Sequence, residues 1–395
     1  MGDDDAGTPP GVLGPGAGAS AVGGGLRRRR RRRLRWSGAA ALALGVTVVG
    51  VGWAVYAELS GNITADEAAA AELARYDKER PTALVRGAQN VLVIGSDSRS
   101  GDGNGRYGRD TGTERSDTTI LLHLAADRDS ATAVSLPRDL MVDVPGCRRP
   151  DGSRTAPAFA PFNQAFEAGG SACTIRTAEK LTGIRIDHHV VVDFQGFKKM
   201  VDALDGVEVC LREPVHDKDA RLSLPAGRVT LDGEQALGYV RARKSLGDGS
   251  DTDRMERQQR FLGALVSKVQ SNDVLLNPVK LYPVLDAATS SLTTDPGLAS
   301  LRGLYDLVRG LRGLPAERVQ FLTVPREPYA RDADRDQLVE PAAEKLFTRL
   351  RTDEPVTVAA AKNPATENPA TKAPGNGASP EPTFSGNTAA EDICR

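Results

Sequence analysis

The chain has 395 residues, of which 26% are charged and 40% are hydrophobic. This composition is ordinary for a globular protein and excludes a chain that is disordered throughout. The length suffices for one large domain or for two small ones with tails. The net charge of −1 conceals a segregation, because residues 1–36 hold eight arginines and three aspartates, a sum of +5, so that the remainder carries −6.

The N-terminal region predicts a membrane anchor. Residues 1–36 begin with Gly, Ala and Asp in no periodic pattern, and we predict a disordered basic tail there. Residues 37–57 (SGAAALALGVTVVGVGWAVYA) carry no charge and are 21 in number, which is enough for a helix to cross a bilayer. Trp36, Trp53 and Tyr56 lie near the ends of this segment, where aromatic rings prefer the interface. Because cationic residues before such a segment stay in the cytoplasm, the rest of the chain is expected on the outside.

This region also resembles two other kinds of segment. Residues 55–57 (VYA) resemble a signal-peptide cleavage site, but the apolar stretch is longer than the usual signal core. The run from Arg27 to Arg33 resembles a nucleic-acid-binding arm, but membrane topology and anionic lipid suffice to explain a basic cluster beside a membrane segment. We therefore predict a retained single-pass anchor, with the membrane as a partner and no nucleic acid.

The four cysteines indicate an oxidising compartment. All of them follow the apolar segment, and their spacing is not that of a zinc site. An exterior location would let them pair. Cys147 and Cys173 flank one loop-and-helix segment and are our first expected pair, which leaves Cys210 and Cys394 as the second.

After the anchor, residues 58–84 are expected to form an extracytoplasmic stalk. Residues 64–67 (TADE) form a capping box before an alanine-rich run, which predicts a short helix to about Tyr76. Pro81 ends this pattern.

From Asn90 onward, short apolar runs alternate with helical patterns, which predicts one α/β domain over residues 85–352. The runs TTILLHL (118–124) and HVVVDF (189–194) are nearly continuous in apolar residues, as in strands that are covered on both faces. The expected fold is therefore α/β, a three-layer α/β/α sandwich with a central mixed sheet, behind one transmembrane helix. Residues 353–395 are expected to form a low-complexity tail without a core. Strands are expected at 90–95, 118–125, 131–136, 187–193 and 207–211, with weaker ones at 140–144, 228–231 and 319–323, and helices at 174–182, 194–204, 233–242, 254–270, 297–312 and 339–350.

Arginine and aspartate recur at the ends of the expected strands. Asp97 and Arg99 follow the first strand, Asp117 (with Arg115) precedes the second, and Arg138 and Asp139 follow the third. A strand that ends in polar residues exposes them at the rim of the sheet, where open α/β folds bind ligands. Pro137 fixes the backbone where the third strand ends, so the next side chain has a defined direction.

A second group of such residues comes later in the chain. Arg241 and Arg243 lie near a helix end, and Arg254, Arg257 and Gln258 share one helix face at i, i+3 and i+4. Any one of these arginines can simply pair with a neighbouring acid at the surface. Taken together, several guanidiniums beside carboxylates suit a pyrophosphate that is bridged by a divalent cation.

The sequence also lacks several catalytic motifs. There is no G-x-x-x-x-G-K-[ST] loop, GSDSR lacks the second glycine of a nucleophile elbow, and the histidines do not form HExxH. His188 and His189 lie in a strand pattern, and alternation predicts one buried and one exposed side chain in place of a metal pair. The stretch GDGNG (101–105) lacks the carboxylates of a calcium loop and is expected to be a loop beside the site.

Six blocks of this sequence, in one order behind one membrane segment, resemble the LytR-CpsA-Psr family of envelope proteins, in its actinobacterial form. The resemblance is close over residues 90–270 and looser to about 350. The blocks are NVLVIGSDSR, RSDTTILLHL, VSLPRD, LTGIRIDHHVVVDFQGFKKMVDALDGVEV, LDGEQALGYVRAR and DRMERQQ.

The resemblance implies a phosphotransferase of cell-wall assembly. Such an enzyme takes a glycopolymer (wall teichoic acid, capsule or arabinogalactan) from a polyprenyl-pyrophosphate carrier and attaches it by a phosphodiester to the muramic acid 6-hydroxyl of peptidoglycan. It further implies an α/β/α fold with an apolar channel for the prenyl chain and dependence on Mg²⁺. The apolar faces of helices 194–204 and 254–270 either line this channel or serve as plain core, because both uses need the same stripe.

Carried onto this sequence, the resemblance implies roles for individual residues. Asp97, Arg99, Asp117 and Arg138 are the implied catalytic residues. Asp97, Asp117 and Asp251 are the implied metal-site residues, although Asp253 is adjacent and the glycine-rich insertion 247–250 leaves the register open. The implied pyrophosphate ligands are Arg99, Arg138, Arg241, Arg243, Arg254 and Gln258.

Either Asp97 or Asp117 is also a candidate to accept the proton of the incoming hydroxyl. The competing functions are a regulatory module that binds the polyprenyl pyrophosphate without turnover, and a lipid pyrophosphatase that uses water as the acceptor.

Overall fold

The computed structural model describes residues 23–96, 116–149, 151–218, 220–242, 251–271, 277–359, 383–391 and 394. The chain divides into two compact units, Met1–Ala57 and Glu58–Arg395. The long helix α1 (Gly23–Asn62) provides the described part of the first unit and continues into the second. Within it, Leu42–Asn62 is long and apolar enough to cross a membrane, by length and composition. This stretch overlaps the segment 37–57 predicted from the sequence, whereas residues 23–36, predicted as a disordered tail, are helical.

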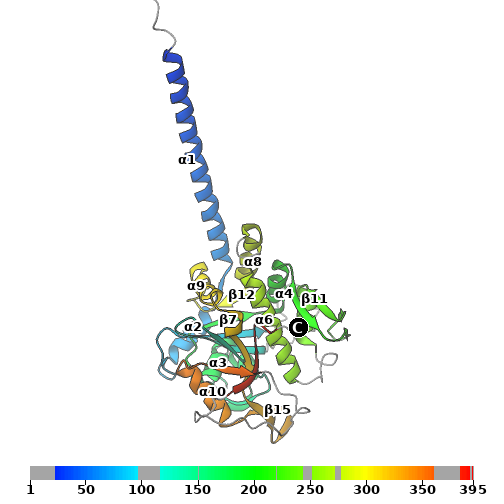
Figure 1. Ribbon diagram of the computed structural model, residues 1–395. Coiled ribbons are helices and arrows are strands. Elements are labelled where there is room, and N and C mark those ends of the chain that lie inside the picture. The colour runs from blue at the N-terminus through cyan, green and yellow to red at the C-terminus, as the bar shows by residue number, and fades with distance from the viewer. Residues whose placement is uncertain are drawn as a thin grey trace, which may run out of the picture. The chain divides into compact units, whose positions relative to one another are not determined.

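The second unit is built around a mixed sheet, as predicted (Figure 1). In its centre β2 (Gln89–Ser96) pairs in parallel with β7 (His188–Val192) and antiparallel with β3 (Ser116–Leu124). β3 pairs antiparallel with β4 (Ala131–Leu136), and β4 pairs in parallel with β13 (Val319–Thr323). The complete order is β1 (Thr64–Ala65), β12 (Leu292–Thr294), β7, β2, β3, β4, β13, β17 (Thr383–Thr388) and β16 (Thr357–Ala359).

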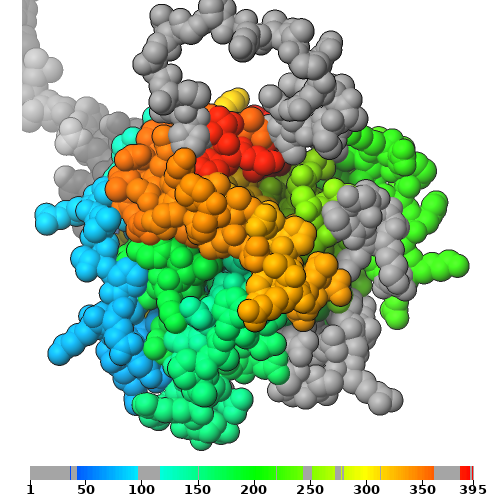
Figure 2. Space-filling model, turned by 90° about the horizontal axis from the view of Figure 1, so that it is seen from below, coloured from blue at the N-terminus to red at the C-terminus, as the bar shows by residue number. Residues whose placement is uncertain are grey.

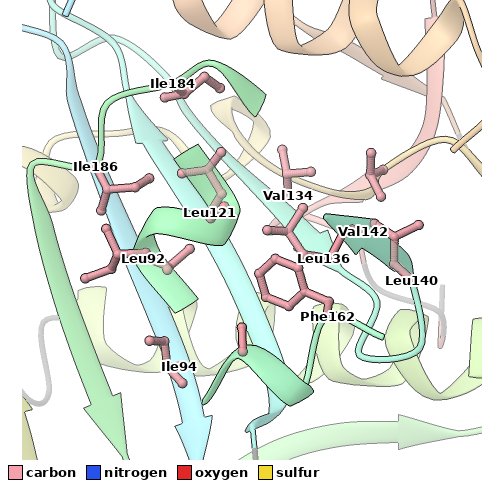
Figure 3. Packing of buried hydrophobic residues seen from close by; sticks show 14 of the residues in the cluster. Leu92, Ile94, Leu121, Val134, Leu136, Leu140, Val142, Phe162, Ile184 and Ile186 are labelled. Carbon is pink, nitrogen blue, oxygen red and sulfur yellow. The ribbon is translucent and has the colours of Figure 1, made fainter. Parts of the chain in front are cut away.

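Helices cover both faces of this sheet, which confirms the predicted three layers. On one face Leu92, Ile94, Leu121 and Val134 are buried against α3 (Gln164–Thr182) and α10 (Ala342–Arg351) (Figure 3). The alternate strand residues point to the other face, where α9 (Leu301–Arg312) and α6 (Asp251–Gln270) cover them. Because both faces are buried, the strand sequences read as continuous apolar runs.

A smaller lobe adjoins the sheet and carries part of the predicted helical pattern. Its core joins α4 (Phe194–Ala203), α5 (Gly233–Arg241) and one side of α6 to two short hairpins. Phe197 and Phe261 meet there with ring centroids 5.5 Å apart. The apolar stripes of both predicted helices thus contribute to packing, and a lipid channel along them stays a prediction. The hairpins are β8 (Val207–Leu211) with β11 (Gly227–Leu231), and β9 (Val215–Asp217) with β10 (Leu222–Leu224).

Several elements differ from the predictions. Helix α8 (Pro278–Ser291), which packs on α4, was not predicted, and α6 begins at Asp251 instead of 254. Helix α3 begins ten residues before the predicted 174–182. The prediction missed its first part because Gly169 and Gly170 adopt non-helical angles and kink the helix, which interrupts its periodic pattern. Two further hairpins are β5 (Met141–Val144) with β6 (Ala158–Pro161), and β14 (Arg326–Tyr329) with β15 (Asp332–Leu338).

The helix predicted to run to about Tyr76 is present as α2 (Glu67–Arg75), but residues 58–84 belong to the folded unit and do not form a separate stalk. Asp66, and not Thr64, caps the helix α2 (Glu67–Arg75), and Ala69 and Leu73 on this helix are buried in the main core. Farther on, the Arg80 guanidinium donates two hydrogen bonds of 2.7 and 2.9 Å to opposite oxygens of Glu179 on α3. The residues that were predicted to form a stalk therefore cover one end of the sheet.

The predicted tail is wrong in part for the same reason. β17 pairs antiparallel with β13, and β16 pairs in parallel with β17, so both extend the central sheet. Phe384 and Ala389 are buried, at 6% and 8% exposure. The α/β domain therefore does not end at 352.

On the face shown in Figure 2, α10 (orange) and the β14–β15 hairpin (yellow-orange) lie next to one another.

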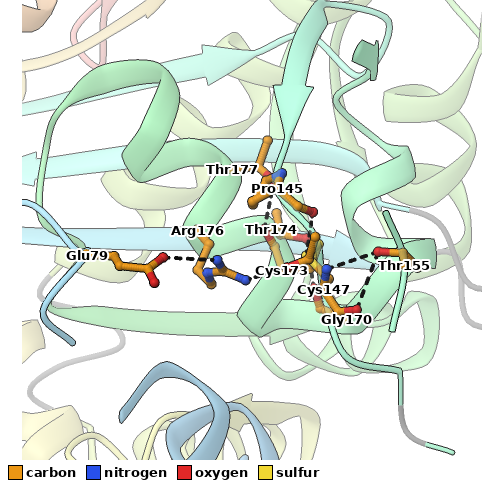
Figure 4. The surroundings of a disulfide bond; sticks show 10 residues. Glu79, Pro145, Cys147, Thr155, Gly170, Cys173, Thr174, Arg176 and Thr177 are labelled. Carbon is orange, nitrogen blue, oxygen red and sulfur yellow. Dashed lines mark hydrogen bonds and ion pairs between the residues drawn. A yellow bond between two sulfur atoms is a disulfide. The ribbon is translucent and has the colours of Figure 1, made fainter. Parts of the chain in front are cut away.

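Both expected disulfides are present. Cys147–Cys173 joins the segment after β5 to α3, with Cα atoms 5.7 Å apart (Figure 4). A Cβ at Gly169 would lie 3.0 Å from the Cβ atoms of both cysteines, so a larger residue there would push against the bridge. Cys210–Cys394 ties the C-terminal segment to β8.

We expect the double variant Cys210→Ser/Cys394→Ser to lose about 2–4 kcal/mol of unfolding free energy. The bridge closes a loop of 184 residues in sequence, so it restricts the unfolded chain strongly. Pulse proteolysis of the full chain in urea measures this loss. An unfolding free energy equal to that of the unaltered chain would show that the C-terminal strand is held by the sheet alone.

Candidate active site

The edge of the sheet gathers the strand ends that the sequence singled out. Ser96 at the end of β2 pairs with Ser116 at the start of β3, and Leu136 at the end of β4 pairs with Thr119. Asp117 and Arg138 therefore come to the same edge. Asp97, Arg99, Arg115, Arg243 and the loop 101–105 lie outside the described residues, so their predicted places stay predictions.

Arg138 is the centre of the described part of this site. Its Nη1 lies 3.2 Å from Asp117 Oδ1, and its Nε donates to Asp139 Oδ2 at 2.9 Å. Burial by itself lowers the pKa of Arg138, but the negative charges of Asp139, Asp117 and Asp251 outweigh burial and raise it. The guanidinium stays charged and faces three carboxylates.

The first turn of α6 adds an acid and an arginine to this edge. Arg254 Nη2 lies 2.5 Å from Asp251 Oδ1, and the Arg254 side chain is only 7% exposed. Asp251 Oδ2 is buried and has no hydrogen-bond partner among the described residues. Because Asp251 acts electrostatically on Arg138, the structure brings Asp117, Arg138, Asp251 and Arg254 together.

Two further predicted pyrophosphate ligands, Arg241 and Gln258, lie where α5 meets α6, together with Arg257. Gln258 Nε2 donates to the carbonyl of Val240 at 3.1 Å. Arg257 donates to the carbonyl of Ala242, and Arg241 lies with its Cζ 4.5 Å from the ring centroid of Phe194. In these positions Gln258 and Arg257 hold the end of α5, and Arg241 packs on the start of α4.

The β14–β15 hairpin contributes residues that were not predicted for the site. Arg335 forms an ion pair with Asp139, and Arg326 forms one with Asp336. Arg326 Nη2 also donates to Thr252 Oγ1 in the first turn of α6 at 2.6 Å. The alternation of charged residues in RDADRDQL (331–338) was a signal for an exposed hairpin, but not for its packing on this edge.

Asp336 and Gln259 further connect these elements. Burial raises the pKa of Asp336, Arg326 opposes this, and the charges of Asp251 and Asp139 reinforce the rise. Gln259 is 3% exposed and donates to Ser135 Oγ on β4 and to Thr323 Oγ1 on β13 at 3.1 and 3.0 Å. These bonds hold the first half of α6 over the same edge.

The residues present fit a phosphate-bridged magnesium ion. Among the described residues, no three His, Cys, Asp or Glu side chains converge as a metal cage. Mg²⁺ is usually held by one or two carboxylates together with water and substrate phosphates. Asp117 and the buried oxygen of Asp251, whose charges both act on Arg138, supply such a donor set.

The histidine pair lies toward the opposite edge of the sheet. His189 is 1% exposed, with Nε2 3.3 Å from Asp66 Oδ2, while His188 is half-buried, with Nδ1 3.1 Å from Asp295 Oδ1. The predicted alternation is thus observed, with a partly exposed His188. A cavity of about 510 Å³ adjoins them, and Leu73 and Ile175 are among the residues that line it. Burial raises the pKa of Asp66, but hydrogen bonds, that of His189 first, outweigh it and lower the pKa to about 2.

We expect the His188–Asp295 pair to stabilise the fold in a pH-dependent way. The hydrogen bond to Asp295 raises the pKa of His188 against the effect of burial, so the folded state binds the proton more tightly than the unfolded state. This stability is fully present below about pH 6.5 and is lost as pH rises through the folded-state pKa. The difference in unfolding free energy between the unaltered chain and His188→Gln should therefore be larger at about pH 5.5 than at about pH 8.5, by of the order of 1 kcal/mol. Equal differences at the two pH values would contradict this.

Comparison with known proteins places the chain in one family. The model of the LytR_cpsA_psr family matches residues 57–352. The probable cell wall biosynthesis protein LcpB of Corynebacterium glutamicum is 37% identical over 273 residues, which cover 66% of this chain and 61% of LcpB. The polyisoprenyl-teichoic acid–peptidoglycan teichoic acid transferase TagT of Bacillus subtilis is 30% identical over 268 residues, 64% of this chain and 77% of TagT.

A solved structure shares the fold. The LytR-Csp2A-Psr enzyme from Actinomyces oris superposes with a TM-score of 0.54 at 24% identity, over 69% of this chain and 93% of that one. The chain spans only about three fifths of the length of LcpB. The family match covers the helical layers, the edge that carries Arg138 and all strands of the central sheet except β16 and β17. The chain therefore belongs to the LytR_cpsA_psr family.

Proposed function

We propose that this protein transfers a glycopolymer from a polyprenyl-pyrophosphate carrier to the muramic acid 6-hydroxyl of peptidoglycan. The observation that carries the proposal is the cluster at the sheet edge, in which Arg138 and Arg254 alternate with Asp117, Asp139 and Asp251. Forked guanidiniums suit phosphate oxygens, and carboxylates suit a cation that bridges them. The relatives named as teichoic acid transferases support this choice of substrates.

In the proposed reaction, the acceptor oxygen attacks the phosphorus that carries the glycan. The bond from this phosphorus to the bridging oxygen breaks, and polyprenyl phosphate leaves with the bonding electron pair. A phosphodiester between glycan and acceptor forms, and the hydroxyl proton passes to a carboxylate. No nucleoside triphosphate is needed, because the carrier is already activated.

The chain's own residues would act mainly by alignment and charge neutralisation, which is what phosphoryl transfer requires. Arg138 is held by Asp117 and Asp139, so its orientation is set before substrate binds. Arg254 lies almost buried beside Asp251, where its charge is screened little by water. Asp117, whose side chain is 35% exposed, can reach an incoming hydroxyl, as can Asp97 in the predicted arrangement.

Magnesium is proposed as the cofactor, with Asp117 and Asp251 as described ligands and Asp97 as a further one. When bound, it would neutralise charge on the diphosphate and on the departing phosphate. Asp97 and Asp117 are each proposed for both roles, metal ligand and proton acceptor, because the same carboxylate chemistry suits both.

We further propose that α1 anchors the chain in the cell membrane, with the arginine-rich end in the cytoplasm and the catalytic domain outside. The basic run before the apolar stretch supports this orientation. A reporter enzyme that is active only outside the cytoplasm, fused after residue 60, should be active. Activity of a cytoplasm-only reporter at the same position would reverse the topology.

The test of the proposed function uses the full chain in proteoliposomes with a synthetic lipid-pyrophosphate glycan, a peptidoglycan fragment and Mg²⁺. Mass analysis should find the glycan joined to the fragment through one phosphate. Free glycan phosphate with an unmodified fragment would identify a lipid pyrophosphatase. Retention of intact substrate by the protein would identify a regulatory module that binds the carrier.

A further inference from the structure

Two helices of the folded unit expose apolar side chains that the core does not use. In the described part of residues 58–395, few large hydrophobic side chains are exposed, and most of those that are exposed lie on α8 and α9. Tyr282 and Leu285 on α8 are 37% and 38% exposed, and Tyr305 and Val308 on α9 are 62% and 45% exposed. Leu84 and Phe159 are exposed elsewhere in the unit.

Helix α9 carries apolar side chains on both its inner and its outer face. Leu304, Leu307 and Leu311 pack inward onto the sheet, so the burial of α9 is accounted for without Tyr305 and Val308. Residues 305 and 308 are neighbours one turn apart on its outer face. Arg302, whose side chain is 90% exposed and lies 4.0 Å from the exposed Asp306, and the exposed Arg309 flank them. An aromatic and an aliphatic side chain between arginines is the pattern of a helix that lies in a lipid interface.

Helix α8 is tied to the residues at which the apolar stretch enters the folded unit. Asn62 Nδ2 donates to Asp286 Oδ1 on α8 at 2.9 Å, and Asp286 lies one turn of α8 from Tyr282. Asn62 is the last residue of the stretch Leu42–Asn62, which can cross a membrane. A bilayer that holds this stretch therefore brings its surface to Tyr282. Figure 1 draws α8 and α9 at the same end of the folded unit.

We propose that the outer faces of α8 and α9 rest on the membrane, with Tyr282, Leu285, Tyr305 and Val308 in the interface and Arg302 and Arg309 on anionic lipid phosphates. Tyrosine prefers this depth because its ring is apolar and its hydroxyl is polar. An arginine near an anionic lipid surface is attracted to its phosphates. The proposal rests on α1 crossing the membrane and is independent of the reaction at the sheet edge.

Lipid contact fixes the tilt of the folded unit. An anchor attached at one point leaves a domain free to turn, whereas two further helices on the surface hold one face toward the lipid. The catalytic edge then keeps a constant height above the bilayer, which suits a substrate whose diphosphate lies at the headgroups.

The test is tryptophan quenching by lipids with brominated acyl chains. The chain has only two tryptophans, Trp36 and Trp53, so both can be replaced by phenylalanine in the full chain. Tyr305→Trp in this background reports on α9, and Phe159→Trp is the matched control, because Phe159 is 54% exposed on β6. A third chain that retains Trp53 alone reports on insertion of α1.

In proteoliposomes that contain anionic phospholipid, we expect about two-fold quenching of the tryptophan at 305 and little at 159. Arg302→Glu with Arg309→Glu, or neutral lipid alone, should reduce the quenching at 305. If Trp53 is quenched while the tryptophan at 305 behaves like that at 159, the proposal is wrong. Protection of 305 from aqueous iodide without quenching by lipid would also overturn it, because a second protein then covers α9. If Trp53 itself is not quenched, the anchor is wrong and the proposal falls with it.

Discussion

Arg138→Ala is expected to reduce glycan transfer by about 10²–10³-fold, the usual cost of removing one preorganised charge-stabilising donor. Arg138 is the described residue that touches both Asp117 and Asp139, and its charge is kept by three carboxylates. Without it, these acids would repel both one another and the diphosphate. Arg138→Lys should recover only part of the activity, because an ammonium cannot present the forked pair of donors. Initial rates of transfer in the proteoliposome assay measure both effects.

The matched control is Arg228→Ala. Arg228 pairs with Glu208 at 3.0 Å, but both side chains are about half exposed and lie in the smaller lobe, away from the sheet edge. This variant should transfer at the unaltered rate. An Arg138→Ala protein that unfolds at the same urea concentration as the unaltered chain and still transfers at full rate would remove Arg138 from the site.

Glu179→Ala is expected to lower the free energy of unfolding by about 3–5 kcal/mol. The Glu179 side chain is 2% exposed and accepts hydrogen bonds from Arg80 and from the backbone N–H of Ile186 at 2.9 Å. Its loss leaves the Arg80 guanidinium, only 11% exposed, without a carboxylate. An uncompensated buried charge costs far more than the net contribution of an exposed pair.

Pulse proteolysis in urea measures this change without relying on tryptophans that lie in α1. Glu208→Ala, which breaks the exposed pair with Arg228, is the control and should cost at most about 1 kcal/mol. Equal losses in the two variants would mean that residues near Arg80 do not belong to the folded unit after all. The result therefore also tests the correction of the predicted stalk.

The sequence predicted the elements whose signal is local. β4 and β8 have the predicted bounds, because each is a short apolar run with breakers at both ends. Helix α8 was missed, since Pro283 and a mixed pattern obscure its amphipathic face. β17 was missed because it is short and polar, and its partner β13 lies about sixty residues earlier in the chain. Pairing over such a separation leaves no periodic mark in either strand.

The candidate site follows the same division. Asp117, Arg138, Asp251 and Arg254 could be grouped in advance, because strand ends and a helix start meet at one edge of an α/β sheet. The contribution of Arg326 and Arg335 could not, because nothing in REPYARDADRDQL (326–338) shows where the hairpin packs. The stalk was misjudged for a related reason. An alanine-rich helix has only a small apolar face, so its sequence does not show whether it packs against other elements. In α2, the surface that it packs on buries Ala69 and Leu73.

The most direct test of the central claim follows the phosphorus itself. The carrier is synthesised with radioactive phosphorus only in the phosphate next to the glycan, and is incubated with the full chain, Mg²⁺ and peptidoglycan. If the cluster around Arg138 holds a lipid diphosphate for attack by a sugar hydroxyl, the label moves into a phosphodiester on the peptidoglycan and the released polyprenyl phosphate is unlabelled. Label that stays on the lipid, or appears only as glycan phosphate in solution, contradicts it.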